Sequence, residues 1–198
     1  MLMKKILSIA AALLLGAVAL YAQDAIYGIK SGHLKFETQT SGGMQYNEFW
    51  FDDYGRIRKQ HDQTEMEGLG TYHTEIIYRD GKAYTNAWFD DEKKDEAKVT
   101  DLGEYPNFLE MDEEFMKKNK IQILGTEEVL GRTCTIYTYK YKSLLRTITR
   151  KDWVWKGIVL KMETKGILGA NNLMVVTEIQ ENVKIPASTF ALPAKIIE

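Results

Sequence analysis

The chain has 198 residues and a formal net charge of −2 at pH 7; 44% of its residues are hydrophobic and 27% are charged. This length allows one domain with a substantial core. The mildly acidic balance argues against nucleic acid as a partner, because nucleic-acid binding needs a basic face. The single cysteine, Cys134, excludes an internal disulfide, so we expect the core to stabilise the fold unaided.

The first 22 residues are typical of a cleavable export signal. The basic pair Lys4–Lys5 precedes an apolar run, Ile6–Leu20, and Ala22 is a small residue ahead of the expected cleavage before Gln23. The apolar run is shorter than the about 20 residues of a membrane-spanning helix, although an uncleaved anchor is the alternative. Residues 23–198 would form a single β domain.

This signal predicts an exported protein, in the periplasm or at the periplasmic face of the outer membrane. After cleavage the chain would have no transmembrane segment. It would not itself be a lipoprotein, because no cysteine lies near the cleavage site. Loss of two lysines with the signal would change the net charge from −2 to −4.

Alternation of apolar and polar residues predicts short antiparallel strands in the first half of the chain. The dipeptide Asp80-Gly81 is the strongest hairpin signal, and it joins the last two of these strands. The acidic and basic segment 90–96 breaks the pattern and is expected to be an exposed loop. The predicted strands are Ile26–Thr38, Met44–Phe51, Arg56–Gln63, Thr71–Arg79 and Ala83–Phe89.

One helix is predicted in the middle of the chain. Asp112 can cap its N-terminus, acidic residues follow in the first turn, and Lys117 and Lys118 suit the last turn before Asn119. The apolar residues near this helix would lie along one stripe and could cover an open end of a barrel. They are Phe108, Met111, Phe115 and Met116.

Strand patterns resume after the helix and continue almost to the end of the chain. We count roughly nine to eleven strands in all at hairpin spacing, which is typical of an all-β sandwich or barrel. The predicted strands of this half are Ile121–Leu124, Glu127–Leu130, Cys134–Tyr141, Leu145–Arg150, Trp153–Lys165 and Leu173–Asn182.

No combination of residues marks a catalytic or metal site. The three histidines, His33, His61 and His73, lack the His-x-x-x-His spacing of a helical zinc site and are expected to be exposed. No Gly-x-Ser-x-Gly motif is present, and Cys134 alternates with threonines as a buried, inert thiol would. We therefore expect no enzyme activity, no cofactor and no metal.

The end of the chain resembles a known family. The phrase Asn182-Val-Lys-Ile-Pro-Ala-Ser-Thr-Phe-Ala-Leu-Pro193, together with the signal, the serial strands and the central helix, is similar to the periplasmic lipoprotein carriers of the LolA/LolB type. It looks most like the uncharacterised secreted domains related to them. This chain lacks the opening helix of the carriers and has one clear lid helix. The resemblance implies a mainly β fold, an antiparallel half-open barrel with one or two short helices as a lid. It also implies that the concave face holds acyl chains, so the partner would be a lipid or a lipidated protein.

Candidate ligand-lining residues follow from the inward positions of the predicted strands. A cavity lined by aromatic residues and by adaptable methionines would suit an acyl chain. An envelope interaction protein with a filled barrel is the main alternative, and a hydrolase with an unrecognised site is the third. The lining candidates are Tyr72, Ile76, Tyr78, Ile158, Leu160, Met162, Leu173 and Val175, and the lid candidates are Phe108, Phe115 and Met116.

Overall fold

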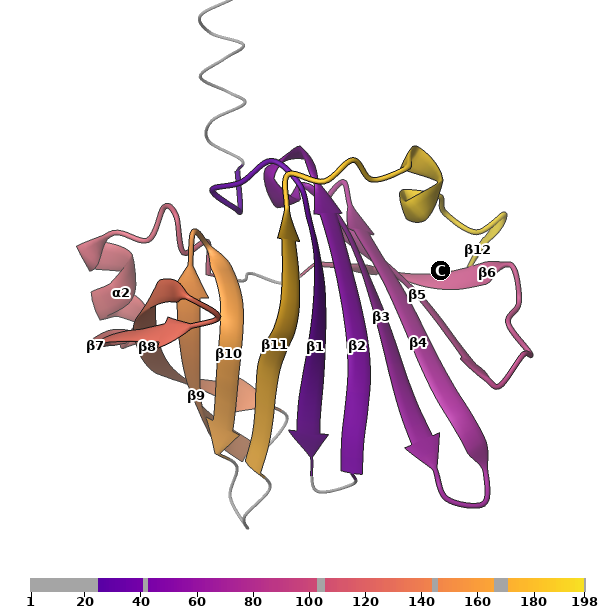
Figure 1. The fold of residues 1–198 in the computed structure, drawn as a ribbon, viewed down its shortest axis with the longest axis horizontal. Coiled ribbons are helices and arrows are strands. Elements are labelled where there is room, and N and C mark those ends of the chain that lie inside the picture. Colours follow the sequence, from indigo (N-terminus) through magenta and orange to yellow (C-terminus); the bar gives the residue numbers. More distant parts are fainter. Residues whose placement is uncertain (1–24, 41–42, 103–105, 144–145, 166–170, 198) are drawn as a thin grey trace, which may run out of the picture.

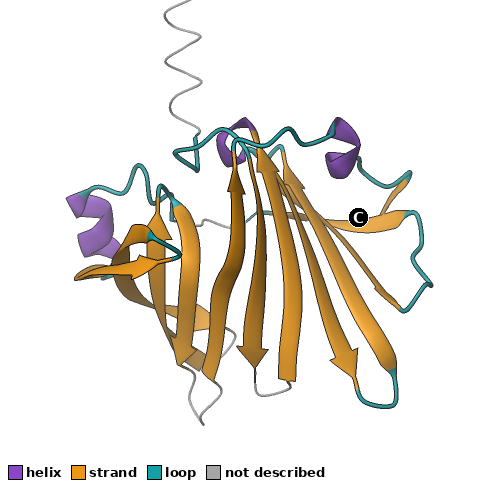
Figure 2. Ribbon diagram, viewed as in Figure 1, coloured by secondary structure: helices purple, strands orange, loops and turns teal. Residues whose placement is uncertain are grey.

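The computed structural model describes residues 25–40, 43–102, 106–143, 146–165 and 171–197. These residues form one twelve-stranded sheet that curves strongly and stays open (Figure 1). Nearly all regular structure is strand, with very little helix (Figure 2). The mainly β fold and the half-open barrel are thereby confirmed. The predicted signal, residues 1–22, lies outside the described residues, and the single-domain boundary stays a prediction.

Two antiparallel meanders make up the sheet. The first contains β1 (Gly32–Thr40), β2 (Gly43–Asp52), β3 (Ile57–Met66), β4 (Gly70–Arg79), β5 (Lys82–Phe89) and β6 (Glu96–Asp101). The second contains β7 (Gln122–Val129), β8 (Arg132–Ser143), β9 (Arg146–Trp155), β10 (Ile158–Lys165) and β11 (Asn171–Glu181). The two meanders meet where β11 pairs antiparallel with β1, which places the two halves of the chain side by side.

Short elements complete the chain. The α2 helix (Glu113–Asn119) precedes β7, and two single-turn 3-10 helices occupy Asp53–Gly55 and Ala187–Phe190. The second of these buries Phe190. The final strand, β12 (Lys195–Ile197), runs parallel to β6 at one edge of the sheet, while β7 forms the other edge.

Local sequence signals explain the sharpest turns. The predicted hairpin is confirmed between β4 and β5, where Asp80 and Gly81 have φ values of 53° and 72°. Positive φ at both central residues is the geometry that twists a two-residue hairpin correctly. Asp112 caps α2 as predicted, because its side chain accepts a hydrogen bond from the Phe115 amide at 2.7 Å.

Several strand boundaries differ from the prediction. The run 153–165 is divided between β9 and β10 by a turn at Lys156 and Gly157, with φ values of 47° and 79°. The two strands expected at 121–124 and 127–130 are a single strand, β7, in which the pairing shifts at Gly125. Strands β6 and β12 were not predicted, because both are short: β6 is largely polar, and β12 has only three residues and lies at a sheet edge.

The register divides the residues of each strand between two faces. Leu34, Phe49 and Gln60 lie opposite one another on β1, β2 and β3, on the face we call concave. The residues just before or after them, such as Trp50 and Lys59, lie on the convex face. The largest buried cluster is centred on the strands where the two meanders join; it contains Ile29, Leu34, Phe51, Val129, Cys134, Trp153, Ile158, Leu160 and Val176.

Candidate ligand-binding cavity

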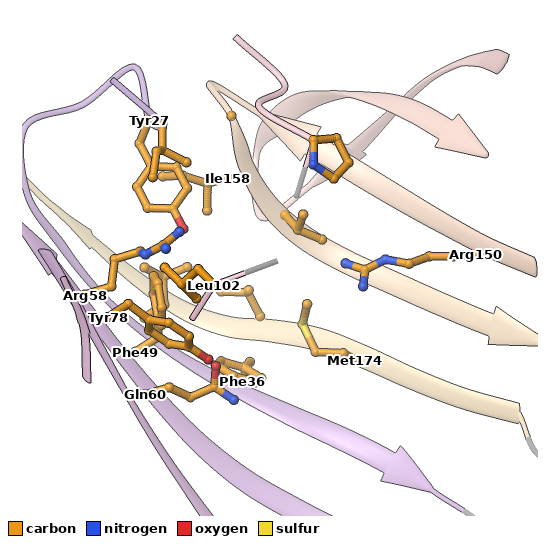
Figure 3. Close-up of a pocket in the computed structure, with 16 residues that line it drawn as sticks. Tyr27, Phe36, Phe49, Arg58, Gln60, Tyr78, Leu102, Arg150, Ile158 and Met174 are labelled. Atoms are coloured by element: carbon orange, nitrogen blue, oxygen red, sulfur yellow. The ribbon is translucent and has the colours of Figure 1, made fainter. Parts of the chain in front are cut away.

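A cavity of ≈ 580 Å³ lies against the concave face of the sheet (Figure 3). Its wall comes from both meanders, since side chains of β1 to β4 meet side chains of β9 to β11 across it. Leu102, after β6, and Pro106, before α2, contribute from the connecting segment. Most of the lining is apolar: Ile26, Leu34, Phe36, Phe49, Leu102, Pro106, Ile158, Val159, Met174 and Val176.

One corner of the cavity is polar and aromatic. Arg58 and Gln60 reach it from β3, Tyr78 from β4, and Tyr27 from the segment before β1. The guanidinium carbon of Arg58 lies 5.0 Å from the centre of the Tyr78 ring, a cation–π contact. The Tyr27 ring packs edge-on against Phe51 with centroids 4.7 Å apart, which fixes its hydroxyl toward Arg58.

Burial controls the protonation of the two tyrosines. It raises the pKa of Tyr27, and Arg58 only partly opposes the rise through its charge and a side-chain hydrogen bond. Burial also raises the pKa of Tyr78, again with Arg58 acting in the opposite direction. Both phenols therefore keep their protons at neutral pH and can donate hydrogen bonds into the cavity.

A second arginine of the cavity is fully engaged within the fold. Arg150 donates from Nε to both oxygens of Asp152, at 2.8 and 2.9 Å. Tyr139 donates its hydroxyl to the same carboxylate at 2.8 Å. Asp152 has no exposed surface, and burial raises the pKa of its carboxyl against the opposing effect of Arg150 and Tyr139. Of these three residues Arg150 lines the cavity, while Asp152 is buried behind it and Tyr139 lines a second cavity.

Some predicted lining residues lie at the cavity. Tyr78 and Ile158 line it directly. Tyr72 and Ile76 alternate with the convex residues of β4 and share the concave face with Tyr78. Met162 lies opposite the lining residue Met174 across β10 and β11. Leu160 is fully buried in the core. Contact of these residues with a ligand stays a prediction.

The alternation expected for β11 has the opposite phase. Leu173 and Val175 pair with Glu163 and Lys161, and so lie on the convex face, whereas their neighbours Met174 and Val176 line the cavity. The phase was not readable because residues 173–176 are all apolar. A one-residue shift moves every side chain of a strand to the other face.

The predicted lid residues lie beside β8, away from the first cavity. Phe108 packs against Tyr137 with ring centroids 5.0 Å apart. Phe115 lines a second cavity of ≈ 550 Å³ between α2 and β8, together with Met111 and Tyr141. Met116 is half-buried and lines neither cavity in the described part of the chain. Leu102 and Pro106 line the first cavity, whereas no residue of α2 does. The lid role of the helix stays a prediction.

Sequence reasoning missed most of the lining residues, among them the three polar strand residues Arg58, Gln60 and Arg150. Strand β3 reads Ile-Arg-Lys-Gln-His-Asp-Gln, so charge and polarity occur on both faces and no alternation marks the inward side. The hairpin register was the available signal, because Tyr78 was correctly assigned to the concave face and pairs with Arg58.

Ring stacking organises the histidines on the convex face. His33 stacks on Trp50 with centroids 4.9 Å apart and bonds Glu48 at 2.7 Å. His61 and His73 stack on Trp88, and all three histidines are half-buried rather than exposed as predicted. Cys134 is buried, as predicted, and burial raises the pKa of its thiol. Within the described residues, no group of three His, Cys, Asp or Glu side chains could hold a metal ion.

Comparison with known proteins supports the fold but gives no family assignment. No protein-family model matches the chain, and no curated protein matches it. Among solved structures, an uncharacterized conserved protein from Thermus thermophilus is similar, with a TM-score of 0.54 and 7% sequence identity over 95% of this chain and 98% of that chain. The MucA/MucB complex of Pseudomonas aeruginosa gives a TM-score of 0.53 at 14% identity over 89% of this chain. The chain spans only 60% of the length of that second protein.

At these identities the likeness concerns the fold alone. It places the chain among proteins built on a similar curved sheet. In the described ranges, no helix is both long and apolar enough to cross a membrane.

Proposed function

We propose that this protein is a non-catalytic periplasmic binding protein that holds a lipid or an acylated ligand against the concave face of its sheet. The observation that carries the proposal is the cavity of ≈ 580 Å³ with a mostly apolar wall. Its volume falls within the roughly 300–1,000 Å³ typical of small-molecule sites. The export signal predicted at residues 1–22 supports the periplasmic location.

The energetics of an acyl guest suit a carrier. An acyl chain of about 14 methylenes gains roughly 11 kcal/mol on leaving water, at about 0.8 kcal/mol for each buried CH₂. A bilayer offers the chain nearly the same gain. A cavity therefore needs only to match the membrane for transfer to proceed in either direction, and no catalytic group is required. An outer-membrane lipoprotein or a free lipid would be suitable cargo.

An envelope interaction protein is the second candidate, and one observation favours it. Edge strand β7 is exposed along nearly its whole length, with Ile123 and Leu124 about half exposed, at 53% and 51%. An exposed apolar edge is a template for pairing with an extended segment of another chain. The similar MucB structure was solved together with MucA, which is consistent with a protein partner for such a fold.

The first experiment is native mass spectrometry of the protein purified from its own envelope, followed by organic extraction. We expect a co-purifying acyl lipid that leaves the protein on extraction and can be reloaded. A matched pair of variants locates the site. Met174→Trp fills the cavity and should reduce loading at least tenfold, whereas Val175→Trp places the same ring on the convex face and should not.

Two outcomes would contradict the proposal. One is a protein that carries no lipid and cannot be loaded with any. The other is equal loss of loading in both tryptophan variants, since the cavity would then not be the binding site.

A further inference from the structure

The apolar cavity contains one cation that no described carboxylate neutralises. Arg58 has no ion pair within the described ranges of the chain, and its Nε is buried without a hydrogen-bond partner there. Charges that are removed from water are normally paired in proteins, and a buried polar atom without a partner destabilises the fold. Arg58 does donate a side-chain hydrogen bond to the Tyr27 hydroxyl, but a guanidinium at a cavity wall with no carboxylate partner in the described chain and an unsatisfied Nε calls for an explanation.

The nearest acidic neighbours on the concave face are already engaged. Asp62 follows Arg58 on the same strand and face at a distance of roughly 13 Å, given about 3.3 Å per residue. It accepts hydrogen bonds from Gln60 and from Asn47. Asp152, on the far wall, accepts from Arg150 and Tyr139. Of the two arginines that line the cavity, Arg58 alone is left without a carboxylate among the described residues.

The groups around Arg58 are two phenols held in place by packing, and the Tyr27 hydroxyl accepts a hydrogen bond from the arginine. Figure 3 shows its guanidinium between the rings of Tyr27 and Tyr78 at one end of the cavity. Both hydroxyls stay protonated at neutral pH because burial raises the pKa of each tyrosine. A guanidinium flanked by two phenol donors is suited to an anionic oxygen group. The wall beyond it, through Phe36 and Met174, is apolar.

We propose that Arg58 binds the anionic head group of an amphiphile, a carboxylate or a phosphate, whose acyl chain occupies the apolar remainder of the cavity. This inference rests on the proposed function, and it narrows the ligand class from any acylated molecule to an anionic one. An arginine matches carboxylate and phosphate geometry with two parallel N–H donors, which a lysine cannot reproduce.

Isothermal titration calorimetry with four ligands of identical tail tests the inference: decanoate, decyl phosphate, decanol and decyltrimethylammonium. We expect the protein to bind the better anion about 10- to 100-fold more tightly than decanol, the range of a charge-assisted hydrogen bond. The cation should bind most weakly. Whichever of decanoate and decyl phosphate binds more tightly identifies the head group.

Three variants assign the preference to the residue. Arg58→Gln should lose the preference for the anion over decanol, and Arg58→Lys should retain part of it. Arg79→Gln is the matched control, because this substitution changes the net charge equally. Arg79 lies on the convex face and bonds only the exposed Asp80 in the described structure. This variant should behave as wild type.

Ligand-free stability gives an independent readout. Since Arg58→Gln removes a half-buried charge that has no ion pair in the described chain, thermal unfolding of the empty variant should occur at or above the wild-type temperature. Unfolding at a clearly lower temperature would assign Arg58 a structural role and overturn the inference. The inference is also overturned if the wild type shows no preference for the anion, or if Arg58→Gln keeps that preference. In either case, binding of decanol would leave the proposed function intact. Failure of all four ligands to bind would instead contradict the proposed function.

Discussion

Charged residues on the two faces of strand β3 have different partners. On the convex face, the Nζ of Lys59 lies 2.7 Å from Oε2 of Glu75, and the Nζ of Lys93 lies 2.9 Å from the other oxygen of the same carboxylate. On the concave face, the adjacent residue Arg58 meets two tyrosines and, within the described ranges, no carboxylate. The convex charges are thus paired within the protein, whereas the concave face has one cation that is available to bind another molecule. A charge that the fold leaves unpaired can therefore mark a binding surface.

The convex pairing is strong enough to change the titration of Glu75. Burial raises the pKa of this carboxyl, but the hydrogen bonds and charges of Lys59 and Lys93 outweigh it, so the net pKa is lowered. The lysines also lie over tryptophan rings, Lys59 over Trp50 at 5.8 Å and Lys93 over Trp88 at 4.7 Å. Charge, ring and carboxylate therefore form one network that spans β2 to β5.

The largest expected effect is on the concave face, where the buried carboxylate that pairs with an arginine can be removed. Asp152→Ala removes this fully buried group and breaks its hydrogen bonds with Arg150 and Tyr139. We expect a loss of about 3–5 kcal/mol in the free energy of unfolding, measured by denaturant titration.

Asp152→Asn is the matched control, since it keeps the shape and some hydrogen bonding. It should lose less stability, because burial already disfavours the charged carboxylate and raises the pKa of Asp152. Equal stability of wild type and Asp152→Ala would mean that the concave face does not depend on pairing Arg150, and the contrast between the two arginines would lose its basis.

A smaller effect is expected on the convex face. Glu75→Gln removes the charge that joins Lys59 and Lys93 and should lower the free energy of unfolding by about 1–3 kcal/mol. The control is Glu178→Gln, which breaks the exposed pair with Lys35 and should have no measurable effect. If the two variants lost equal stability, the convex network would be no more than a set of ordinary surface pairs.

The smallest effect concerns pH and the stacked histidines. Burial, and then the charge of His73, lower the pKa of His61 below its ordinary value of 6.5. The unfolded chain therefore takes up a proton at a higher pH than the folded one. The contribution of neutral His61 to the free energy of unfolding is complete above about pH 6.5, and it is lost as the pH falls toward the lowered pKa of His61 in the folded protein.

The free energy of unfolding should change with pH by well below the limit of about 1.4 kcal/mol per pH unit for one proton, because solvent screens the half-buried His61 ring. The measurement is the free energy of unfolding of wild type minus that of His61→Gln across this pH range. A difference that does not change with pH would show that the His61–Trp88 stack tolerates the imidazolium, as an aromatic ring over a cation can.

The sequence predicted those elements whose signal is local. Asp80-Gly81 specifies its hairpin by backbone geometry alone, and Asp112 specifies the start of α2 through one side-chain hydrogen bond. The inward assignment of Tyr78 and Ile158 also agrees with the cavity, because each belongs to a strand with visible alternation.

Features that depend on distant parts of the chain could not be predicted. The phase of β11 was assigned incorrectly because Leu173 and Val175 are apolar on the convex face as their neighbours are on the concave one. Arg58 and Arg150 look alike in sequence, and only the folded structure shows that Arg150 has the carboxylate of Asp152 as a partner whereas Arg58 has no carboxylate partner within the described residues. Whether a charged residue is paired depends on the three-dimensional arrangement of the strands, which the local sequence pattern does not show.

The position of β11 between β1 and β10 has a consequence for how the protein matures. Until residues 171–181 emerge, β1 and β10 each lack a neighbour and expose a row of free amide and carbonyl groups. The sheet is complete only when residues 171–181 pair with β1, more than 130 residues earlier in the chain, and such long-range pairing slows folding. Until then two strand edges can pair with other chains, and the cavity between the two meanders forms only when β11 has paired with both β1 and β10.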